Sequence, residues 1–364
     1  MNSAMQHDPT HFWRGKRVLL TGHTGFKGGW MALCLQRWGA QVTGLALSPS
    51  TQPNLYELAQ IGQGMDSYFQ DIRDAEGVSK RVLDCRAEIV LHLAAQPLVR
   101  ASYAQPIETF STNVMGTAHV LQALRGLSDV KVAVIITTDK VYRNLEHSYP
   151  YREDDALGGH DPYSASKAAC ELVTASYRDS FLKAQGVAVA TARAGNVIGG
   201  GDWSQDRLLP DAARAWESGA VLKIRNPQST RPWQHVLEPV IGYLRLAERL
   251  WHQPALAGAY NLGPQTHEAA TVQQVIELAQ QAYGQGEWGS ELDPNAVHEA
   301  GWLALEIAKA RKLLNVHPCW DLKESVQRTM HWYRQCAQGQ DARKLCENDL
   351  HAFEVANALQ RTAA

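Results

Sequence analysis

Residues 17–28 read Arg17-Val18-Leu19-Leu20-Thr21-Gly22-His23-Thr24-Gly25-Phe26-Lys27-Gly28, and this stretch decides the fold. It joins an apolar run to a turn with glycines at 22, 25 and 28, after which apolar residues recur at helical spacing. A glycine turn between a first strand and a first helix lets backbone N–H groups approach a pyrophosphate, whose charge is favoured at the positive helix end. The stretch therefore predicts a strand at 17–22, a helix at 28–38 and a dinucleotide site between them, with a plain tight turn as the alternative.

Strand and helix patterns alternate beyond this first unit. Further strands are predicted at 41–47, 67–71, 89–94, 132–138 and 187–195, and helices at 78–86, 107–127 and 163–181. Apolar, mostly β-branched strands that alternate with amphipathic helices are typical of a parallel sheet covered by helices on both faces. The expected fold class is therefore α/β, with a Rossmann-type doubly wound parallel sheet.

The alternation ends after Gly195, where the run Gly199-Gly200-Gly201-Asp202-Trp203 introduces another region. Helices are predicted there at 208–218, 237–250, 272–282, 305–314 and 323–335, with a short strand at 259–263. We expect a dinucleotide-binding domain over 14–195, joined by part of 235–263, and a smaller α/β substrate-binding region over 196–340. Ligands of open α/β sheets bind beyond the carboxyl ends of the strands, so residues just after each strand are the candidates for a site.

The charges of the chain nearly cancel, because 35 Lys and Arg stand against 37 Asp and Glu in 364 residues. A net charge of −2 provides no general field for nucleic acid or an anionic membrane, so neither is expected as a partner. The sequence shows no secretory leader and no apolar run of about 18 residues, which favours a cytoplasmic protein. The six cysteines form no CxxC pair and the 14 histidines no HExxH motif, so free thiols and no metal site are expected.

The residues around the glycine turn indicate which cofactor to expect. An acid that binds the adenosine ribose should follow about 20 residues on, but the second strand ends Leu47-Ser48-Pro49-Ser50, with neither acid nor arginine. We expect NAD rather than NADP, loosely held, with Asp71 after the third strand as a substitute partner for adenine and a solvated turn as the alternative there. The cofactor-binding residues expected in these segments are Gly22, His23, Thr24, Gly25, Phe26, Lys27, Asp71 and Ile72.

A tyrosine and a lysine open the helix that follows the fifth strand. Tyr163 and Lys167 are four residues apart, so on a helix they share a face, and the fifth strand ends Thr137-Thr138-Asp139-Lys140. A phenol is a poor base near neutral pH, but a neighbouring ammonium and a positive nicotinamide ring both favour the phenolate. Tyr163 is therefore predicted to take a proton from a substrate alcohol as hydride leaves its carbon.

Together these motifs resemble the extended short-chain dehydrogenase/reductase family over about residues 14–335. The resemblance rests on Gly22-x-x-Gly25-x-x-Gly28, Leu93-Ala94-Ala95-Gln96, Asn113, Thr138 and Tyr163-x-x-x-Lys167. Within that family, Thr138-Asp139-Lys140, the run from Arg193 to Trp203 and Arg231-Pro232-Trp233-Gln234-His235-Val236 resemble the CDP-glucose 4,6-dehydratases. The resemblance implies NAD as cofactor, with Leu93, Ala94, Ala95 and Gln96 beside it, CDP-glucose as substrate, and a homodimer or dimer of dimers formed through helices 107–127 and 163–181.

The pair Asp139-Lys140 distinguishes a dehydratase from an epimerase. An epimerase oxidises and re-reduces one carbon, whereas a dehydratase must also take the proton from carbon 5 and protonate the hydroxyl that leaves carbon 6. The resemblance implies Lys140 as the base and Asp139 as the acid, with Thr138 beside Tyr163; two plain surface charges are the alternative. Because these roles need an uncharged amine and a neutral carboxyl, we expect the two side chains to address different substrate atoms without a tight salt bridge.

A nucleoside diphosphate opposite the nicotinamide needs cationic or amide donors. Arg207 and Arg231 are predicted to bind its phosphates through planar guanidiniums, and Asn196, which follows the sixth strand, to donate to a phosphate oxygen. An ordinary salt bridge is the alternative for Arg231, and packing is favoured over base stacking for Trp203 and Trp233. The rival functions left open are a nucleotide-sugar 4-epimerase, a dehydratase for another nucleoside-diphosphate hexose, and a non-catalytic dinucleotide sensor.

Overall fold

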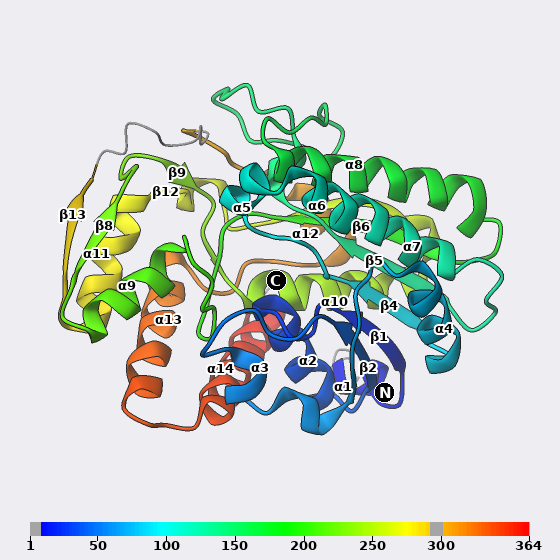
Figure 1. Ribbon diagram of the computed structural model, residues 1–364, viewed down its shortest axis with the longest axis horizontal. Coiled ribbons are helices and arrows are strands. Elements are labelled where there is room, and N and C mark those ends of the chain that lie inside the picture. The colour runs from blue at the N-terminus through cyan, green and yellow to red at the C-terminus, as the bar shows by residue number, and fades with distance from the viewer. Residues whose placement is uncertain (1–8, 292–300, 364) are drawn as a thin grey trace.

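The computed structural model describes residues 9–291 and 301–363 and is built around one large parallel sheet (Figure 1). Its seven strands run in the order β11-β6-β5-β4-β1-β2-β3, so the chain winds outward from β1 in both directions. This order confirms the predicted doubly wound sheet, and its reversal point lies between β1 and β4, where open α/β sheets bind ligands. The strands are β1 (Arg17–Thr21), β2 (Gln41–Ala46), β3 (Asp66–Phe69), β4 (Ile89–His92), β5 (Val132–Ile136), β6 (Ala188–Ala194) and β11 (Gly258–Leu262).

Helices cover both faces of the sheet because its strands bury side chains on both. Leu20 and Val134 belong to one core cluster, and their chain neighbours Leu19 and Ala133 belong to the other. The strands therefore read as continuous apolar runs, as predicted. The helices against the first cluster are α2 (Phe26–Arg37) and α10 (Leu237–His252), and those against the second are α4 (Ala75–Cys85), α7 (Gly116–Ala123) and α8 (Pro162–Tyr177).

The single helix predicted over 107–127 is wrong, because the structure divides this part of the chain. Two short helices, α5 (Val99–Ala104) and α6 (Pro106–Phe110), precede a π-helical turn over Ser111–Met115 that leads into α7. The turn contains Asn113, whose side chain accepts from the Gln96 N–H (2.8 Å) and donates to the Gln96 carbonyl (3.1 Å). π-Helical turns are frequent at functional sites. Here the turn contains the side chain that anchors the loop after β4.

Other predicted helix boundaries also differ from the structure, and α4 begins at Ala75, three residues before the predicted start. α2 begins at Phe26, so Gly28 lies inside its first turn rather than before it. α8 ends at Tyr177 and continues as a second π-helical turn to Leu182. α12 (Ala308–Leu314) starts three residues later than predicted. The turns and short helices not yet named are α1 (Pro9–Trp13), α3 (Leu55–Leu58), η2 (Ile61–Gly64), η4 (Asp139–Val141), η6 (Pro254–Leu256) and η7 (Thr266–Glu268).

The smaller region lies to the left of the sheet in Figure 1 and combines three packed helices with short strand pairs. β11 and α10 leave this region and rejoin the sheet, where β11 pairs with β6 in parallel. None of the helices in the described ranges combines the length and apolar character needed to cross a membrane. The helices are α9 (Leu208–Glu217), α11 (Val272–Tyr283) and α13 (Leu322–Ala337), and the strands are β7 (Val197–Ile198), β8 (Val221–Ile224), β9 (Thr230–Arg231), β10 (Gln234–His235), β12 (Ala270–Thr271) and β13 (Glu287–Ser290).

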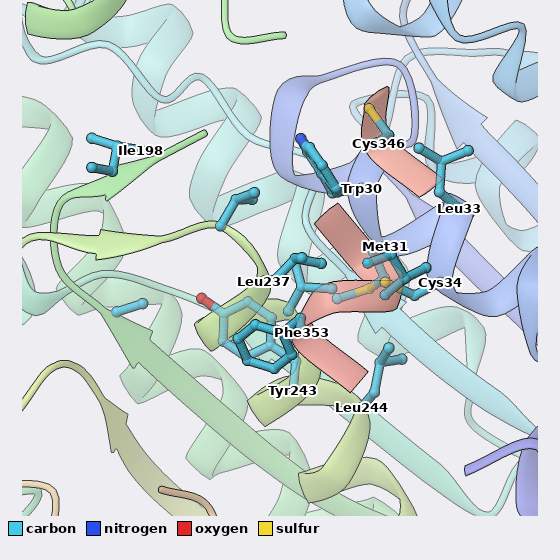
Figure 2. Close-up of a cluster of buried hydrophobic side chains, with 14 of the residues drawn as sticks. Trp30, Met31, Leu33, Cys34, Ile198, Leu237, Tyr243, Leu244, Cys346 and Phe353 are labelled. Atoms are coloured by element: carbon cyan, nitrogen blue, oxygen red, sulfur yellow. The ribbon is translucent and has the colours of Figure 1, made fainter. Parts of the chain in front are cut away.

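A long helix that the sequence analysis did not predict, α14 (Ala342–Ala363), closes the core beside α2 (Figure 2). Its buried residues Cys346 and Phe353 belong to the same core cluster as Cys34 of α2. Glu354 then accepts a hydrogen bond from the Trp38 indole (2.9 Å) and pairs with Arg37. Burial of apolar area drives this docking, and the partly exposed ion pair contributes little beside it.

The glycine turn after β1 is sterically tight at one position and open at another. Gly22 has a φ of +80°, which favours glycine, and its N–H donates to the Leu45 carbonyl of β2 (2.8 Å). A Cβ on Gly28 would overlap the carbonyl oxygen of Gly22, whereas a Cβ on Gly25 would meet the same oxygen at 3.5 Å. The approach of α2 to β1 therefore requires glycine at 28 but not at 25.

Gly28→Ala should lower the free energy of unfolding by about 3 kcal/mol, because the extra carbon has no room beside a backbone carbonyl. Gly25→Ala is the matched control and should cost at most about 1 kcal/mol, the usual effect of alanine at an N-cap position. Chemical denaturation of the ligand-free protein measures both values. Equal losses for the two variants would contradict the steric explanation.

Candidate active site

A cavity of about 350 Å³ lies at the carboxyl ends of β1 to β5, and we call it the glycine-turn cavity. Gly201, Asp202, Trp203, Ser204 and Arg207 of the smaller region also line it. The predicted site residues that line it are Gly22, Thr24, Gly25, Phe26, Lys27, Asp71, Ile72, Leu93, Ala94, Ala95, Tyr163 and Lys167. The structure therefore brings most of the predicted cofactor residues to one place.

Two predicted cofactor residues, His23 and Gln96, do not line this cavity. The His23 ring is buried with its Nε2 2.7 Å from Ser67 Oγ, and it fills space that a side chain on Gly44 would need. Burial lowers the pKa of His23 to about 4, so the ring is neutral. The Gln96 amide donates to the Thr109 hydroxyl (2.9 Å). Both side chains therefore support the walls of the cavity, and any contact of these two residues with a cofactor stays a prediction.

The end of the cavity next to β2 carries hydroxyl groups in place of a ribose-binding acid. Ser48, Ser50 and Thr51 line this end. Asp71 lines the cavity too, but its carboxylate is held by Arg73, with 2.6 Å between Oδ2 and Nη2 and 2.8 Å between Oδ1 and the Arg73 N–H. These hydrogen bonds keep the pKa of Asp71 below its ordinary value. The residues present fit a dinucleotide bound through backbone N–H groups and hydroxyls, without an acid dedicated to its ribose.

Tyr163 and Lys167 reach the cavity from the first turns of α8. Pro162 opens the helix and Asp161 caps it by accepting from the Ser164 N–H (2.9 Å), a pattern that fixes where a helix begins. Lys167 Nζ donates to the Ile136 carbonyl at the end of β5 (3.0 Å). The lysine is therefore tied to the strand that leads into Thr138, Asp139 and Lys140.

The surroundings of Tyr163 within the protein favour the neutral phenol. Burial raises the pKa of Tyr163 to about 12, and a hydrogen bond to Thr138 and the charge of Arg207 act in the opposite direction. Burial also lowers the pKa of Lys167, and it lowers that of Lys27 to about 8 with help from Arg207. A hydroxyl donor and a guanidinium are thus placed to stabilise a phenolate once the proton leaves.

Asp139 and Lys140 lie on the 3-10 turn that follows β5. Asp139 is fully buried, its Oδ1 accepts from the Thr138 hydroxyl (3.0 Å), and its Oδ2 has no hydrogen-bond partner among the described residues. Lys140 Nζ is 3.5 Å from Asp139 Oδ1 and is partly exposed. Charge-assisted hydrogen bonds are about 2.7–2.9 Å long, so the two side chains touch but form no tight salt bridge.

Two larger cavities adjoin the glycine-turn cavity. The lysine cavity has a volume of about 630 Å³ and is lined by Lys140, Tyr142 and Asn144. The outer cavity has a volume of about 640 Å³ and is lined by residues 222–226, which form the end of β8 and the two positions after it. Arg207 lines all three cavities. The residues shared by the lysine and outer cavities are Arg100, Asn196, Asp206, Arg207, Arg225 and Arg231.

The three predicted substrate residues, Asn196, Arg207 and Arg231, all belong to this shared set. Sequence reasoning missed Arg100 and Arg225. Arg100 lies in α5, which was not predicted, and Arg225 follows β8, which is too short to stand out in the apolar pattern. The only feature of the sequence that could have identified these two arginines is their position, because each comes shortly after the end of a strand.

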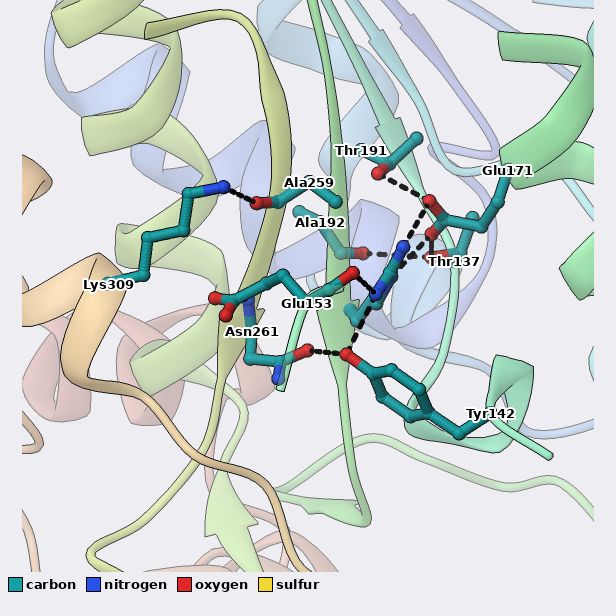
Figure 3. A network of polar contacts seen from close by, with 10 residues as sticks. Thr137, Tyr142, Glu153, Glu171, Thr191, Ala192, Ala259, Asn261 and Lys309 are labelled. Atoms are coloured by element: carbon teal, nitrogen blue, oxygen red, sulfur yellow. Dashed lines mark hydrogen bonds and ion pairs between the residues drawn. The ribbon is translucent and has the colours of Figure 1, made fainter. Parts of the chain in front are cut away.

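A buried polar network supports this end of the sheet (Figure 3). The Glu171 carboxylate of α8 accepts from the hydroxyls of Thr137 (2.5 Å) and Thr191 (2.6 Å) and pairs with Arg193 of β6 (2.9 Å). Arg193 also donates to the hydroxyl of Tyr142 (2.8 Å), which lines the lysine cavity. The network therefore joins α8, β5 and β6 to the wall of the lysine cavity.

Comparison with known proteins agrees with this architecture. The chain is 45% identical to CDP-glucose 4,6-dehydratase of Salmonella typhimurium over 91% of its own length and 94% of that protein's. It is 31% identical to dTDP-glucose 4,6-dehydratase of Streptomyces antibioticus over 72% of the chain and 75% of the relative. Among solved structures, dTDP-glucose 4,6-dehydratase from Bacillus anthracis in complex with NAD superposes with a TM-score of 0.75 at 20% identity, covering 89% of this chain and 98% of that one.

The family comparison covers nearly the whole of the sheet and the smaller region. The profile described as GDP-mannose 4,6 dehydratase matches residues 19–334, which include the glycine turn, the Asp139-Lys140 pair, Tyr163, Lys167 and the shared arginines. With that match and a relative above 30% identity across most of both chains, the protein belongs to the GDP-mannose 4,6 dehydratase family.

Proposed function

We propose that this protein is an NAD-dependent dehydratase that converts CDP-glucose to CDP-4-keto-6-deoxyglucose. The observation that carries the proposal is the Asp139-Lys140 pair after β5, hydrogen-bonded to Thr138 beside Tyr163. The identity of 45% with a CDP-glucose 4,6-dehydratase supports the choice of nucleotide and sugar.

The chain's own groups account for the proton transfers. The glycine-turn cavity, with Gly22, Thr24 and Gly25 in its lining, would hold NAD, which would supply the hydride acceptor for carbon 4 and the hydride donor for carbon 6. Tyr163 takes the proton of the carbon-4 hydroxyl, and the hydrogen bond to Thr138 and the charge of Arg207 favour the phenolate that forms. The carbon-4 ketone then acidifies the proton on carbon 5. Lys140 removes that proton while Asp139 protonates the hydroxyl that leaves carbon 6 as water. Lys140 then gives its proton back to carbon 5 as carbon 6 is reduced.

The positions of Asp139 and Lys140 suit different roles in the elimination. Lys140 lines the lysine cavity and is partly exposed, so its amine can reach a hexose there. Asp139 is fully buried and does not line any of the three cavities, and its Oδ2 has no hydrogen-bond partner among the described residues, so its carboxyl must turn toward the hexose to act as the acid. A single loose contact of 3.5 Å between them leaves both groups able to turn to the substrate.

The alternatives are weaker on the same observations. Several similar solved structures are sugar 4-epimerases, but at 19–24% identity they show the fold alone. An epimerase has no use for an acid and a base beside the oxidation site. A non-catalytic sensor needs neither Tyr163 nor Lys167, and both line the glycine-turn cavity. A dehydratase that acts on another nucleoside-diphosphate hexose would need the same catalytic residues, so only an activity assay can distinguish it from a CDP-glucose dehydratase.

Incubation with NAD and CDP-glucose should yield a product that has lost one water, detected by mass spectrometry, without net consumption of NAD. The dTDP-, UDP- and GDP-hexoses are run in parallel and should react more slowly. Replacement of NAD by NADP should lower the rate. An isomer of unchanged mass would identify an epimerase, and faster turnover of another nucleotide sugar would reassign the substrate.

Lys140→Ala should lower product formation by about 10²- to 10⁴-fold, because the base for carbon 5 is lost while oxidation at carbon 4 remains. Single-turnover absorbance should still show reduced cofactor after CDP-glucose is added. Tyr163→Phe is the control, because it removes the earlier proton acceptor and should abolish that absorbance as well. Unchanged turnover by Lys140→Ala would contradict the proposed base.

We also infer a homodimer formed through α6, the π-helical turn over Ser111–Met115, α7 and α8. Exposed apolar side chains gather on these elements, which pack against one another and lie together in Figure 1. Ile107 is 80% exposed, Met115 50% and Leu172 63%. Apolar side chains clustered on adjacent helices are typical of a protein–protein interface.

Ile107→Asp combined with Leu172→Asp should convert the dimer to a monomer, because two charges would have to be buried in the interface. Light scattering coupled to size exclusion measures the mass. Leu83→Asp is the matched control, since Leu83 is 60% exposed but lies on α4, and it should leave the dimer intact. A wild-type mass equal to one chain would rule out the inferred dimer.

A further inference from the structure

Asp206 lies between two arginines from distant parts of the chain. Its Oδ1 accepts from Arg100 Nη1 and from Arg225 Nη1, each at 3.1 Å. Arg100 belongs to α5, beside the sheet, whereas Arg225 follows β8 in the smaller region. A single carboxylate oxygen therefore holds together two guanidiniums that reach the same point from both regions.

This point is the junction between the lysine cavity and the outer cavity. Arg100, Asp206 and Arg225 line both cavities, together with Arg207 and Arg231. The proposed function places the hexose beside Lys140, so the nucleoside must occupy the outer cavity and the diphosphate must cross the junction. The Asp206 carboxylate thus binds guanidiniums at the place where a diphosphate would meet them.

The contacts of Asp206 are of a kind that a diphosphate can replace. The three side chains are 32–40% exposed, and ion pairs with that much exposure to solvent are weak and screened by salt. A diphosphate carries more charge than one carboxylate and offers more acceptor oxygens, and guanidiniums bind phosphate oxygens in pairs. The exchange of one anion for the other therefore favours the diphosphate.

We propose that Arg100 and Arg225 bind the substrate diphosphate and that Asp206 is their internal counter-ion, which the diphosphate displaces. The inference rests on the proposed function for its substrate class. Asp206 lies in the turn directly before α9 and lines both cavities, so its carboxylate is beside the junction when the diphosphate arrives. Its carboxylate then competes for both arginines, which weakens the hold on the diphosphate and speeds product release.

Asp206→Asn should bind CDP about three- to tenfold more tightly than the wild type in calorimetry, and the gain should shrink as salt is raised. Binding of cytidine, which has no phosphate, should not change. Asp211→Asn is the matched control, because Asp211 lines the outer cavity and interacts through space with Arg225 but forms its ion pair with Arg214. That variant should change the affinity for CDP by less than about twofold.

Arg100→Gln and Arg225→Gln should each weaken CDP binding by about tenfold and leave cytidine binding unchanged, since each removes a charged donor to phosphate. The double variant Asp206→Asn/Arg225→Gln should lose most of the gain seen with Asp206→Asn. The two single arginine variants test the proposal even if Asp206→Asn fails to fold, which thermal unfolding reveals.

Inorganic diphosphate is the second probe, because it reports on the arginines whatever base the protein prefers. Suppose that inorganic diphosphate binds more tightly to Asp206→Asn and more weakly to the arginine variants, but that CDP does not bind. This result would support the inference and contradict the choice of a cytidine nucleotide. Weaker CDP binding by Asp206→Asn, an equal gain with Asp211→Asn, or unchanged binding by both arginine variants would overturn the inference. A wild type that binds neither probe would overturn the inference and the proposed function together.

Discussion

Glu171 and Arg193 form an ion pair between α8 and β6 in which each side chain is only 4% exposed. A buried pair is stable only when its remaining hydrogen bonds are made, and here the carboxylate also accepts from Thr137 and Thr191. Tyr163 and Lys167 stand two turns and one turn before Glu171 on the same helix. The pair therefore fixes the depth and rotation of the helix that presents both groups to the glycine-turn cavity.

The same network reaches the substrate side through one tyrosine. Tyr142 accepts from Arg193 and donates to Asn261 of β11 (2.6 Å), and it lines the lysine cavity. The strand that returns from the smaller region is thus bonded to the core that positions the proton-handling residues. Networks of this kind in a low-dielectric interior permit few arrangements, because each unpaired member is costly. The geometry around Lys140 is consequently set by contacts well away from it.

The sequence predicted the parts of the fold that depend on local pattern. Strands buried on both faces read as apolar runs, and the glycine turn and the pair Tyr163 and Lys167 have fixed spacings, so these elements were found. The two-residue strands β7, β9, β10 and β12 carry no such pattern. The breaks near Asn113 depend on a contact with Gln96 that only the folded chain makes. α14 was missed although Cys346, Leu350 and Phe353 have helical spacing, since the apolar residues of this segment are few.

The site was predictable where it follows the strands of the sheet and less so where the smaller region contributes. Asn196 lies two residues after the end of β6, and this position predicted its place at the junction of the lysine and outer cavities. Arg100, Asp206 and Arg225 meet only because α5, the turn before α9 and the segment after β8 converge. The direction of the His23 side chain could not be predicted for a different reason: the glycine spacing marks a turn whose backbone faces the cavity, but it does not say which way each side chain points.

The docking of α14 against α2 also bears on how the chain matures. Arg37 and Glu354 are separated by 317 positions, and Cys34 is fully buried in the finished core. Domains generally acquire structure as they are synthesised, amino-terminal parts first. The apolar surface of α2 that packs against α14 therefore stays uncovered until residues up to about Phe353 have been synthesised. A nascent chain that has already formed every strand of the sheet therefore still exposes the apolar face of α2, to which chaperones can bind.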